Sequence, residues 1–180
     1  MRLAYILLSS VLVSSLLACG PESTPRSEAC SCVPDDEGSG MTPPSPIDCG
    51  DDLCPTILVD DIADNAGTEV KNPEALTCAF DALKSGKPGV IRWSFKANYS
   101  QYDEEGYIVI RDGGTLIRRN WGQMDLDYIV GNAIHGEPPS ANQLEACTVM
   151  TDAVDRFECL RSFAITEIDI CDDGWSIVGS

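Results

Sequence analysis

The hydrophobic pattern between residues 91 and 130 is that of short strands. Apolar and polar residues alternate over 91–96, which is typical of a half-buried strand. Residues 107–111 and 116–121 are compatible with strands on either side of Asp-Gly-Gly-Thr, a sequence suited to a hairpin turn. Alternation returns over 126–130. These segments predict about four strands joined by short links, most simply an antiparallel meander.

Two helices are predicted to flank this meander. The first begins at Asn72-Pro73-Glu74, where Asn is a favoured N-cap and Pro suits the first helical position, and it ends at Gly86. The second begins at Ser140, which forms a capping box with Gln143. The apolar face of the first helix consists of Leu76, Ala79, Phe80 and Leu83. The apolar face of the second consists of Ala146, Met150, Ala153, Phe157, Leu160 and Ala164.

Three shorter segments complete the predicted order of elements. Residues 56–59 are a short apolar run, 166–171 alternate again after the second helix, and 175–178 are expected to form a last edge strand. This order predicts an α+β domain in which two helices pack on one face of an antiparallel sheet of about 4–6 strands. We expect disulfides to staple the domain.

The first eighteen residues have the composition of a secretory signal peptide. Arg2 precedes an apolar run from Leu3 to Leu17, which is too short and too rich in serine for a membrane-spanning helix. Leu16-Leu17-Ala18-Cys19 then resembles the lipobox of bacterial lipoproteins, with Leu three residues before the cysteine and a small residue directly before it. The alternative is a plain secretory signal that precedes a cysteine by chance.

The resemblance implies an address in the bacterial cell envelope. It implies diacylglycerol on the Cys19 thiol, cleavage before Cys19 and acylation of the new N-terminus. Two or three acyl chains on one residue anchor a protein stably, whereas a single chain binds a membrane only marginally. In that family an Asp directly after the cysteine commonly retains the protein at the inner membrane. Gly20 stands there in this chain, so the resemblance implies delivery to the outer membrane.

Composition divides the chain into three parts. After the signal peptide (1–18), residues 19–46 are expected to be a lipidated N-terminus and a tether, and 47–180 a single globular domain. Residues 20–46 contain six of the 11 prolines and lack Ile, Leu, Phe, Trp and Tyr. Such a segment buries too little apolar surface to fold alone.

The cysteines predict a disulfide framework. With Cys19 acylated, eight remain, and an even number in an oxidising compartment predicts up to four disulfides. They are Cys30, Cys32, Cys49, Cys54, Cys78, Cys147, Cys159 and Cys171. Helical geometry places Cys78 opposite its apolar face, and Cys147 and Cys159 at the edges of theirs. We therefore expect bridges from the helices to covering segments, namely residues 47–71 and 171–180.

Two metal-site hypotheses compete with these interpretations. Cys30, Cys32, Cys49 and Cys54 could supply four thiolates for zinc, although neither pair has the CxxC spacing of zinc knuckles. The acid-rich segment Asp48–Glu69 could supply the oxygens that Ca²⁺ prefers, but the EF-hand pattern is missing. Disulfides and a solvated acidic surface are the simpler interpretations, and we predict no cofactor.

Charge narrows the choice of partners. The chain has 29 Asp+Glu and 12 Lys+Arg, a formal net charge of −17, which argues against binding nucleic acid. The hydrophobic fraction of 43% is that of a globular domain rather than a disordered acidic tail. We therefore expect the membrane, through the lipid on Cys19, and an envelope protein or glycan as partners, but no nucleic acid.

Catalytic motifs are scarce. The single histidine, His135, is predicted to lie in a loop and could act as a general base, but a GxSxG nucleophile elbow is absent. A phosphate-binding glycine loop and a CxxC redox pair are absent as well. A catalytic pair of carboxylates, as in a glycosidase, is neither indicated nor excluded by the sequence, because any acid-rich chain offers such pairs.

Aromatic residues offer one further hypothesis. Tyr and Trp residues near acids would suit a glycan or peptide surface if exposed, whereas burial would assign the tryptophans to the core and the tyrosines to the end of a hairpin. The residues concerned are Trp93, Tyr99, Tyr102, Tyr107 and Trp121. We expect a non-catalytic binding or envelope-interaction module, and the alternative is a secreted carboxylate-dependent hydrolase acting, for example, on glycans.

Overall fold

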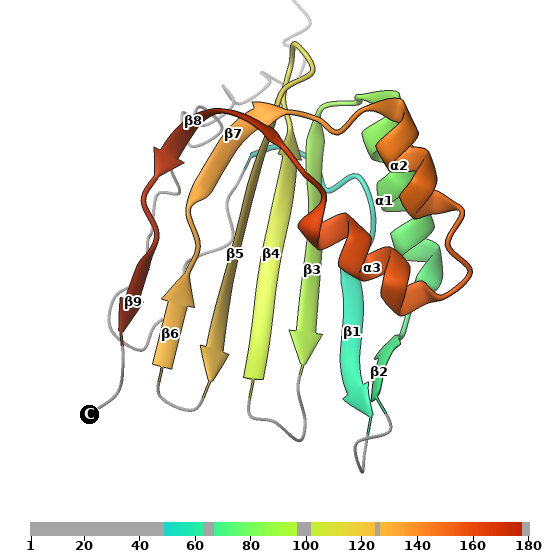
Figure 1. The fold of residues 1–180 in the computed structure, drawn as a ribbon, viewed down its shortest axis with the longest axis vertical. Coiled ribbons are helices and arrows are strands. Elements are labelled where there is room, and N and C mark those ends of the chain that lie inside the picture. Colours follow the sequence, from blue (N-terminus) through green and yellow to red (C-terminus); the bar gives the residue numbers. More distant parts are fainter. Residues whose placement is uncertain (1–48, 63–66, 97–101, 125–126, 178–180) are drawn as a thin grey trace, which may run out of the picture.

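The computed structural model describes residues 49–62, 67–96, 102–124 and 127–177. The predicted signal peptide, the Cys19 lipobox and the tether with Cys30 and Cys32 lie outside these residues, as does Tyr99. Within them, helices cover one face of a single sheet (Figure 1). The predicted α+β class is confirmed.

The sheet is larger than predicted and is mixed. The part of the chain that the structure describes contains nine strands: β1 (Ile57–Ile62), β2 (Gly67–Val70), β3 (Gly89–Lys96), β4 (Tyr102–Ile110), β5 (Leu116–Met124), β6 (Asp127–Val130), β7 (Ala133–Glu137), β8 (Thr166–Asp172) and β9 (Trp175–Ile177). Their order is β2-β1-β3-β4-β5-β6-β9, and β7 pairs with β5 and β8. β1 is parallel to β3, whereas the other pairs are antiparallel.

The predicted antiparallel sheet of 4–6 strands is therefore wrong in strand count and in one pairing. The parallel pair arises because helix α1 (Pro73–Ser85) lies between β1 and β3 in the sequence, and a helical connection lets two neighbouring strands run in the same direction. The central predicted hairpin is confirmed, since β4 and β5 pair in register on either side of Arg111–Thr115.

Part of the excess in strand count comes from strands that bend. β5 pairs with β6 through Trp121–Met124 and with β7 through Leu116–Arg118, so β6 and β7 follow one another along the same neighbour. β9 and β8 continue the pattern, pairing with β6 and β7. One hydrogen bond joins the bend between β6 and β7 to the bend between β8 and β9. Asn132 Oδ1 in the first bend accepts it from the Gly174 N–H in the second, at 2.7 Å.

Helix α1 has the predicted bounds, but its first cap differs from expectation. Gly86 ends the helix in the left-handed region with φ 63°. The Asn72 side chain makes no cap hydrogen bond. Its Oδ1 accepts from the Leu58 N–H and its Nδ2 donates to the Thr56 carbonyl, both at 2.8 Å. The amide binds the backbone of β1 because it offers both a donor and an acceptor to a strand that passes beside it.

The second predicted helix is two helices, α2 (Ala141–Thr148) and α3 (Ala153–Ser162). The predicted capping box at Ser140 and Gln143 is present. The prediction of one continuous helix is wrong, because Asp152 caps a new start. Its Oδ1 accepts from the backbone N–H groups of Val154 and Asp155 at 2.8 and 3.1 Å.

The break changes which residues reach the core. Phe157 and Leu160 are buried as predicted, and Leu144 and Cys147 are buried beside them. Ala146, Met150 and Ala164, assigned to the buried face on the assumption of one helix, are exposed. Met150 lies in the break between the two helices and Ala164 lies beyond the end of α3, so neither belongs to a helical face.

The main core lies between the helices and the sheet. All three helices contribute to it, which confirms that the helices of the described chain pack on one face. Its buried members are Ile57, Val59, Val70, Ala75, Leu76, Ala79, Phe80, Leu83, Ile91, Trp93, Ile108, Ile110, Leu116, Leu144, Cys147, Phe157, Leu160 and Phe163. The alternation predicted over residues 91–96 therefore buries its apolar side as expected.

A second apolar cluster lies on the opposite face of the sheet. Its buried members are Cys49, Val90, Tyr107, Val109, Ile117, Trp121, Val130 and Ala133, with Cys171 and Trp175 packed against them. Adjacent residues of β4 and β5 thus enter different clusters, as the side-chain alternation of a strand requires. The central strands are consequently buried on both faces.

Two disulfides connect described residues. Cys54, before β1, bonds to Cys78 of α1, so the expected bridge from this helix to the segment 47–71 is confirmed. Cys147 of α2 bonds to Cys159 of α3. The expected bridge from each of these two cysteines to a covering segment is wrong, because the helix break folds α3 back beside α2. Cys147 is only 3% exposed and belongs to the core rather than to its edge.

Candidate functional site

His135 lies in strand β7 rather than in the predicted loop. Its Nε2 lies 3.1 Å from the Thr115 hydroxyl and 3.5 Å from the Arg111 Nη1. Both neighbours can occupy the ring nitrogen by hydrogen bonding, and neither is an acid that would orient the ring for base catalysis. This setting gives His135 a structural role at the end of the β4–β5 hairpin.

The tryptophans are core residues. Trp93 and Trp121 are 2% and 6% exposed, and Tyr107 is 2% exposed with its ring centroid 6.0 Å from that of Trp121. The sequence left open whether these aromatic residues are exposed or buried, and the structure shows that these three are buried. An aromatic platform for a glycan is not formed by them, because such a platform needs exposed ring faces.

One pair of carboxylates does line a hollow on the face opposite the helices. Asp103 and Glu105 line it together with Trp121 and Tyr128. The Lys96 Nζ lies 3.0 Å from Asp103 and 3.9 Å from Glu105. Since both carboxylates face the same ammonium group, they have similar surroundings and are not arranged as the separate acid and base of a hydrolase.

A larger hollow, of about 460 Å³, lies between the end of α1 and the start of α2. Its charged lining residues are Lys84 and Glu145, which form an ion pair at 2.9 Å. Leu83, Leu144 and Pro139 contribute apolar surface. The hollow therefore offers apolar surface and one ion pair, but no pair of carboxylates.

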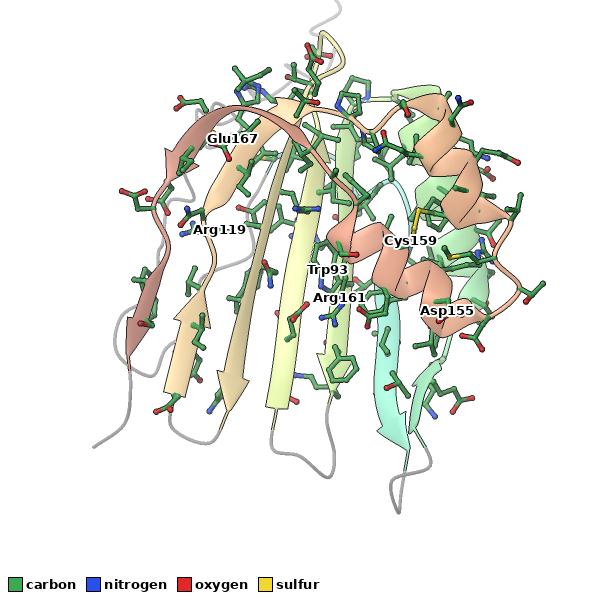
Figure 2. All side chains as sticks on the ribbon, in the orientation of Figure 1. Trp93, Arg119, Asp155, Cys159, Arg161 and Glu167 are labelled. Atoms are coloured by element: carbon green, nitrogen blue, oxygen red, sulfur yellow. A yellow bond between two sulfur atoms is a disulfide. The ribbon has the colours of Figure 1, made fainter. Side chains whose placement is uncertain are left out.

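A charged cluster with one buried member, Glu104, lies between α3 and the sheet. Glu104 is only 4% exposed, and its two oxygens accept from Trp93 Nε1 at 3.3 Å and Arg161 Nη1 at 2.9 Å. Arg161 also donates to Glu158 at 2.7 Å. Figure 2 shows Trp93 and Arg161 at the contact between α3 and the sheet. These bonds compensate the burial of the carboxylate, so the cluster has a structural explanation.

A second buried charge, Arg119, lies on the opposite face. Its side chain is fully buried, forms an ion pair with Asp172, and donates from Nε to the Gly131 carbonyl at 2.9 Å. Burial raises the pKa of Tyr107 to about 12, although the nearby Arg119 charge works against that rise. The cluster ties β5 to the bend between β6 and β7 and to the end of β8.

The acid-rich segment is in part ion-paired. Asp52 accepts from Arg92 at 2.8 Å, and Lys71 lies 2.7 Å from Glu69 and 3.9 Å from Asp60. In residues 49–62, 67–96, 102–124 and 127–177, no group of three or more His, Cys, Asp or Glu side chains is arranged to hold a metal ion. Asp48 and Asp64 lie outside the described residues.

The predicted disulfide residues are in part accounted for. Cys54, Cys78, Cys147 and Cys159 are paired as described, and Cys171 is disulfide-bonded as well. Cys49 is buried at 2% exposure. Pairing of all eight cysteines stays a prediction, as does lipidation of Cys19.

The least covered part of the domain is its β8 end. The helices are grouped at the β1–β3 end of the sheet, and none of the three lies over β6, β8 or β9 (Figure 1). Five consecutive residues of β8, Thr166–Ile170, are exposed. Ile168 and Ile170 are 55% and 39% exposed, and Ile129 of β6 is 57% exposed. We call Ile129, Ile168, Ile170 and the β8 edge the open sheet end.

The open sheet end has one edge without a neighbouring strand. In the described part of the sheet, β8 pairs only with β7. Two register shifts interrupt this pairing, and Ile168 lies at one of them, between the partners of His135 and Gly136. Glu167 and Asp169 stand beside it, and Figure 2 places Glu167 on β8 well away from the helices.

The sequence pattern did not identify this surface. Alternation over residues 166–171 predicts a half-buried strand, and the exposure of Thr166–Ile170 contradicts that prediction. The reason is the extent of the helical layer. α3 ends at Ser162, and β8, which follows it, lies outside the part of the sheet that the helices cover. The sequence did contain one signal for an exposed strand here, namely its charge, because residues 162–180 contain four acids and no Lys, Arg or His.

Comparison with known proteins found no matching family model, no matching curated protein and no matching solved structure. Among the helices that the structure describes, none is both long and apolar enough to cross a membrane. The chemistry of the described surface is therefore the basis for a functional proposal.

Proposed function

We propose that this chain is a lipid-anchored, disulfide-bonded protein of the bacterial cell envelope whose domain binds another protein without catalysing a reaction. The observation that carries the proposal is the exposure of Thr166–Ile170 on a strand that pairs only with β7 in the described part of the sheet. Exposed apolar residues beside an unpaired strand edge are typical of interaction surfaces.

The N-terminal resemblance supplies the anchor in this proposal. Acylation of Cys19 would hold the protein at the membrane, and residues 20–46 would be the tether, with an end-to-end distance of roughly 30 Å if the whole segment were flexible. The predicted disulfides of Cys30 and Cys32 would shorten its free part and hold the domain closer to the lipid headgroups. The domain's acidic character supports attachment through a tether rather than adsorption, because an anionic lipid surface would repel it.

The charged side chains support binding rather than catalysis. A carboxylate-dependent hydrolase needs one carboxylic acid and one carboxylate on either side of the scissile bond. Asp103 and Glu105 share the Lys96 ammonium group, and Glu104 is held by Arg161. These acids therefore have structural partners in place of a substrate.

Mass spectrometry of the protein from its native membrane tests the anchor. We expect the mature chain to begin at Cys19 and to carry the mass of two or three acyl chains. The Cys19→Ser variant should retain residues 1–18 and carry no acyl mass. A mature chain that begins elsewhere without a lipid would contradict the proposal.

Site-specific photo-crosslinking in intact cells tests the binding surface. A photoreactive residue at Ile170 should give a discrete protein adduct, whereas one at Leu58, equally exposed at 45% but at the other end of the sheet, should not. Ile168→Ser in the same protein should abolish the Ile170 adduct, because it removes adjoining apolar surface. Equal labelling from the two positions would contradict binding at the open sheet end.

A further inference from the structure

The backbone of β8 is the most distinctive feature of the open sheet end. β7 takes up the hydrogen-bonding groups on one side of Thr166–Asp172. Along Thr166–Ile170, no strand of the described part of the sheet lies on the other side. Such an edge can take up one more strand, whose main chain would supply the missing hydrogen bonds.

The charge of this edge selects among the strands that it could take up. Glu167, Asp169 and Asp173 are exposed, as is Glu137 at the end of the neighbouring β7. No basic residue lies between Ser162 and Ser180 to offset them. A second copy of β8 would place acids opposite acids, and like charges directly opposite one another destabilise a strand pair. Because the register shift at Ile168 pairs Glu167 and Asp169 with adjacent residues of β7, the two acids lie on opposite faces of β8. A strand that carries Lys or Arg on both faces would be complementary.

The apolar residues define the rest of the incoming strand. Ile170 pairs with the half-buried Ile134, which pairs in turn with Arg118 of β5. Arg118 lies two residues from the core residue Leu116, so both isoleucines lie on the helix-bearing face. None of the three helices lies over β8 (Figure 1). Ile168 adds a second exposed isoleucine two residues away. Apolar side chains on one face of the incoming strand would cover these isoleucines, because side chains of neighbouring strands lie side by side.

We propose that β8 takes up an extended segment of a partner protein, rich in basic and apolar residues, as an additional strand of the sheet. This inference rests on the proposed binding function and names the chemistry of its partner. The acids that discourage self-pairing of the edge would then also attract the partner.

A designed peptide tests the inference on the full-length, detergent-extracted protein. The probe is a synthetic peptide of lysine and valine that carries lysine on both faces of the strand, and its matched control replaces each lysine with glutamate. We expect binding of the lysine peptide only, with slower hydrogen exchange of the β8 backbone amides in the complex. Added salt should weaken the binding, because exposed charges are screened.

Variants locate the binding on β8. Glu167→Lys/Asp169→Lys should weaken binding of the lysine peptide by about tenfold or more, whereas Asp81→Lys, on an exposed position of α1, should leave it nearly unchanged. Ile168→Ser/Ile170→Ser should weaken it by about tenfold, and Leu58→Ser should not. Because all these side chains are exposed, melting temperatures should stay close to that of the wild type.

Several outcomes would overturn the inference. They are failure of the lysine peptide to bind, equal binding of the glutamate peptide, unchanged affinity after Glu167→Lys/Asp169→Lys, unprotected β8 amides in the complex, and a wild-type dimer paired through β8. If the Ile170 photo-crosslink forms while the lysine peptide does not bind, the proposed function stands and the strand-pairing inference fails. If neither result is obtained, both fail.

Discussion

The indole of Trp93 occupies the space that a side chain at Gly106 would need. The two residues are direct partners across β3 and β4, and a β-carbon at Gly106 would lie 2.1 Å from Trp93 Cζ2. This close approach also places the indole Nε1 within 3.3 Å of Glu104 Oε1. A glycine in a central strand thus makes room for the largest side chain of the core.

Gly106→Ala should therefore destabilise the domain by about 3 kcal/mol, because the buried indole would have to shift within the core. Urea unfolding of the wild type and the variant measures the loss. In a Trp93→Leu background the same substitution should cost at least about 1 kcal/mol less, because the clash partner is gone. Equal costs in the two backgrounds would show that the indole is not the obstacle.

Removing Arg161 should cost more than removing an exposed base. Arg161→Met leaves the buried Glu104 carboxylate with one fewer donor, and we expect a loss of about 2 kcal/mol in unfolding free energy. Lys84→Met, which breaks the exposed pair with Glu145, should cost under about 1 kcal/mol. Combining Arg161→Met with Glu104→Gln should recover part of the loss. If the double variant is no more stable than Arg161→Met, the cost does not come from a buried charge.

The two disulfides should each contribute about 3 kcal/mol by restricting the unfolded chain, since they close loops with sequence separations of 24 and 12 residues. Cys54→Ala/Cys78→Ala and Cys147→Ala/Cys159→Ala test them separately by urea unfolding. Full reduction of the wild type should lower the melting temperature more than either double variant does. An unchanged melting temperature on reduction would mean that packing alone holds the domain.

Alkaline pH should destabilise the domain through Tyr107. Burial raises its pKa to about 12 in the folded state, against an ordinary value of 10.0. Between these values the unfolded chain releases the proton while the folded chain keeps it, so stability falls as pH rises. The contribution is fully present below pH 10 and declines by about 1–3 kcal/mol as pH approaches 12. Tyr107→Phe lacks this contribution.

Urea unfolding at about pH 8 and about pH 11 measures the difference. The stability advantage of the wild type over Tyr107→Phe should shrink at the higher pH, by about 1 kcal/mol. Parallel stability losses in both proteins would exclude Tyr107 as the cause. Other groups titrate in the same range but are common to both proteins, so the comparison isolates one hydroxyl.

Local signals in the sequence identified most elements correctly. Pro73 and Gly86 delimit α1, alternation identifies β3, and the two glycines after Asp112 form the turn of the β4–β5 hairpin with φ 95° and 85°. Each of these signals acts within a few residues, through backbone geometry or side-chain period. They therefore determined the α+β class and the helix-covered core without knowledge of the partners.

Local signals were insufficient where a residue had two competing partners. Asn72 has the chemistry of an N-cap, but its amide binds β1, fourteen and sixteen residues away. From the sequence, Asp152 could lie within one long helix or cap the start of a new one. It caps α3, which packs against α2. Cysteine pairing was open for the same reason, since the sequence shows how many thiols exist but not which ones meet.

The sequence by itself determined the segments, their periods, the excess of acids and the resemblance of residues 16–19 to a lipobox. Only the tertiary structure decided that β1 lies parallel to β3, that Cys147 meets Cys159, and that Ile168 and Ile170 stay exposed. Alternation states which side chains share a face of a strand, whereas burial depends on whether another layer reaches that face. In the described part of the domain the helical layer ends before β8, so the isoleucines on that strand stay exposed.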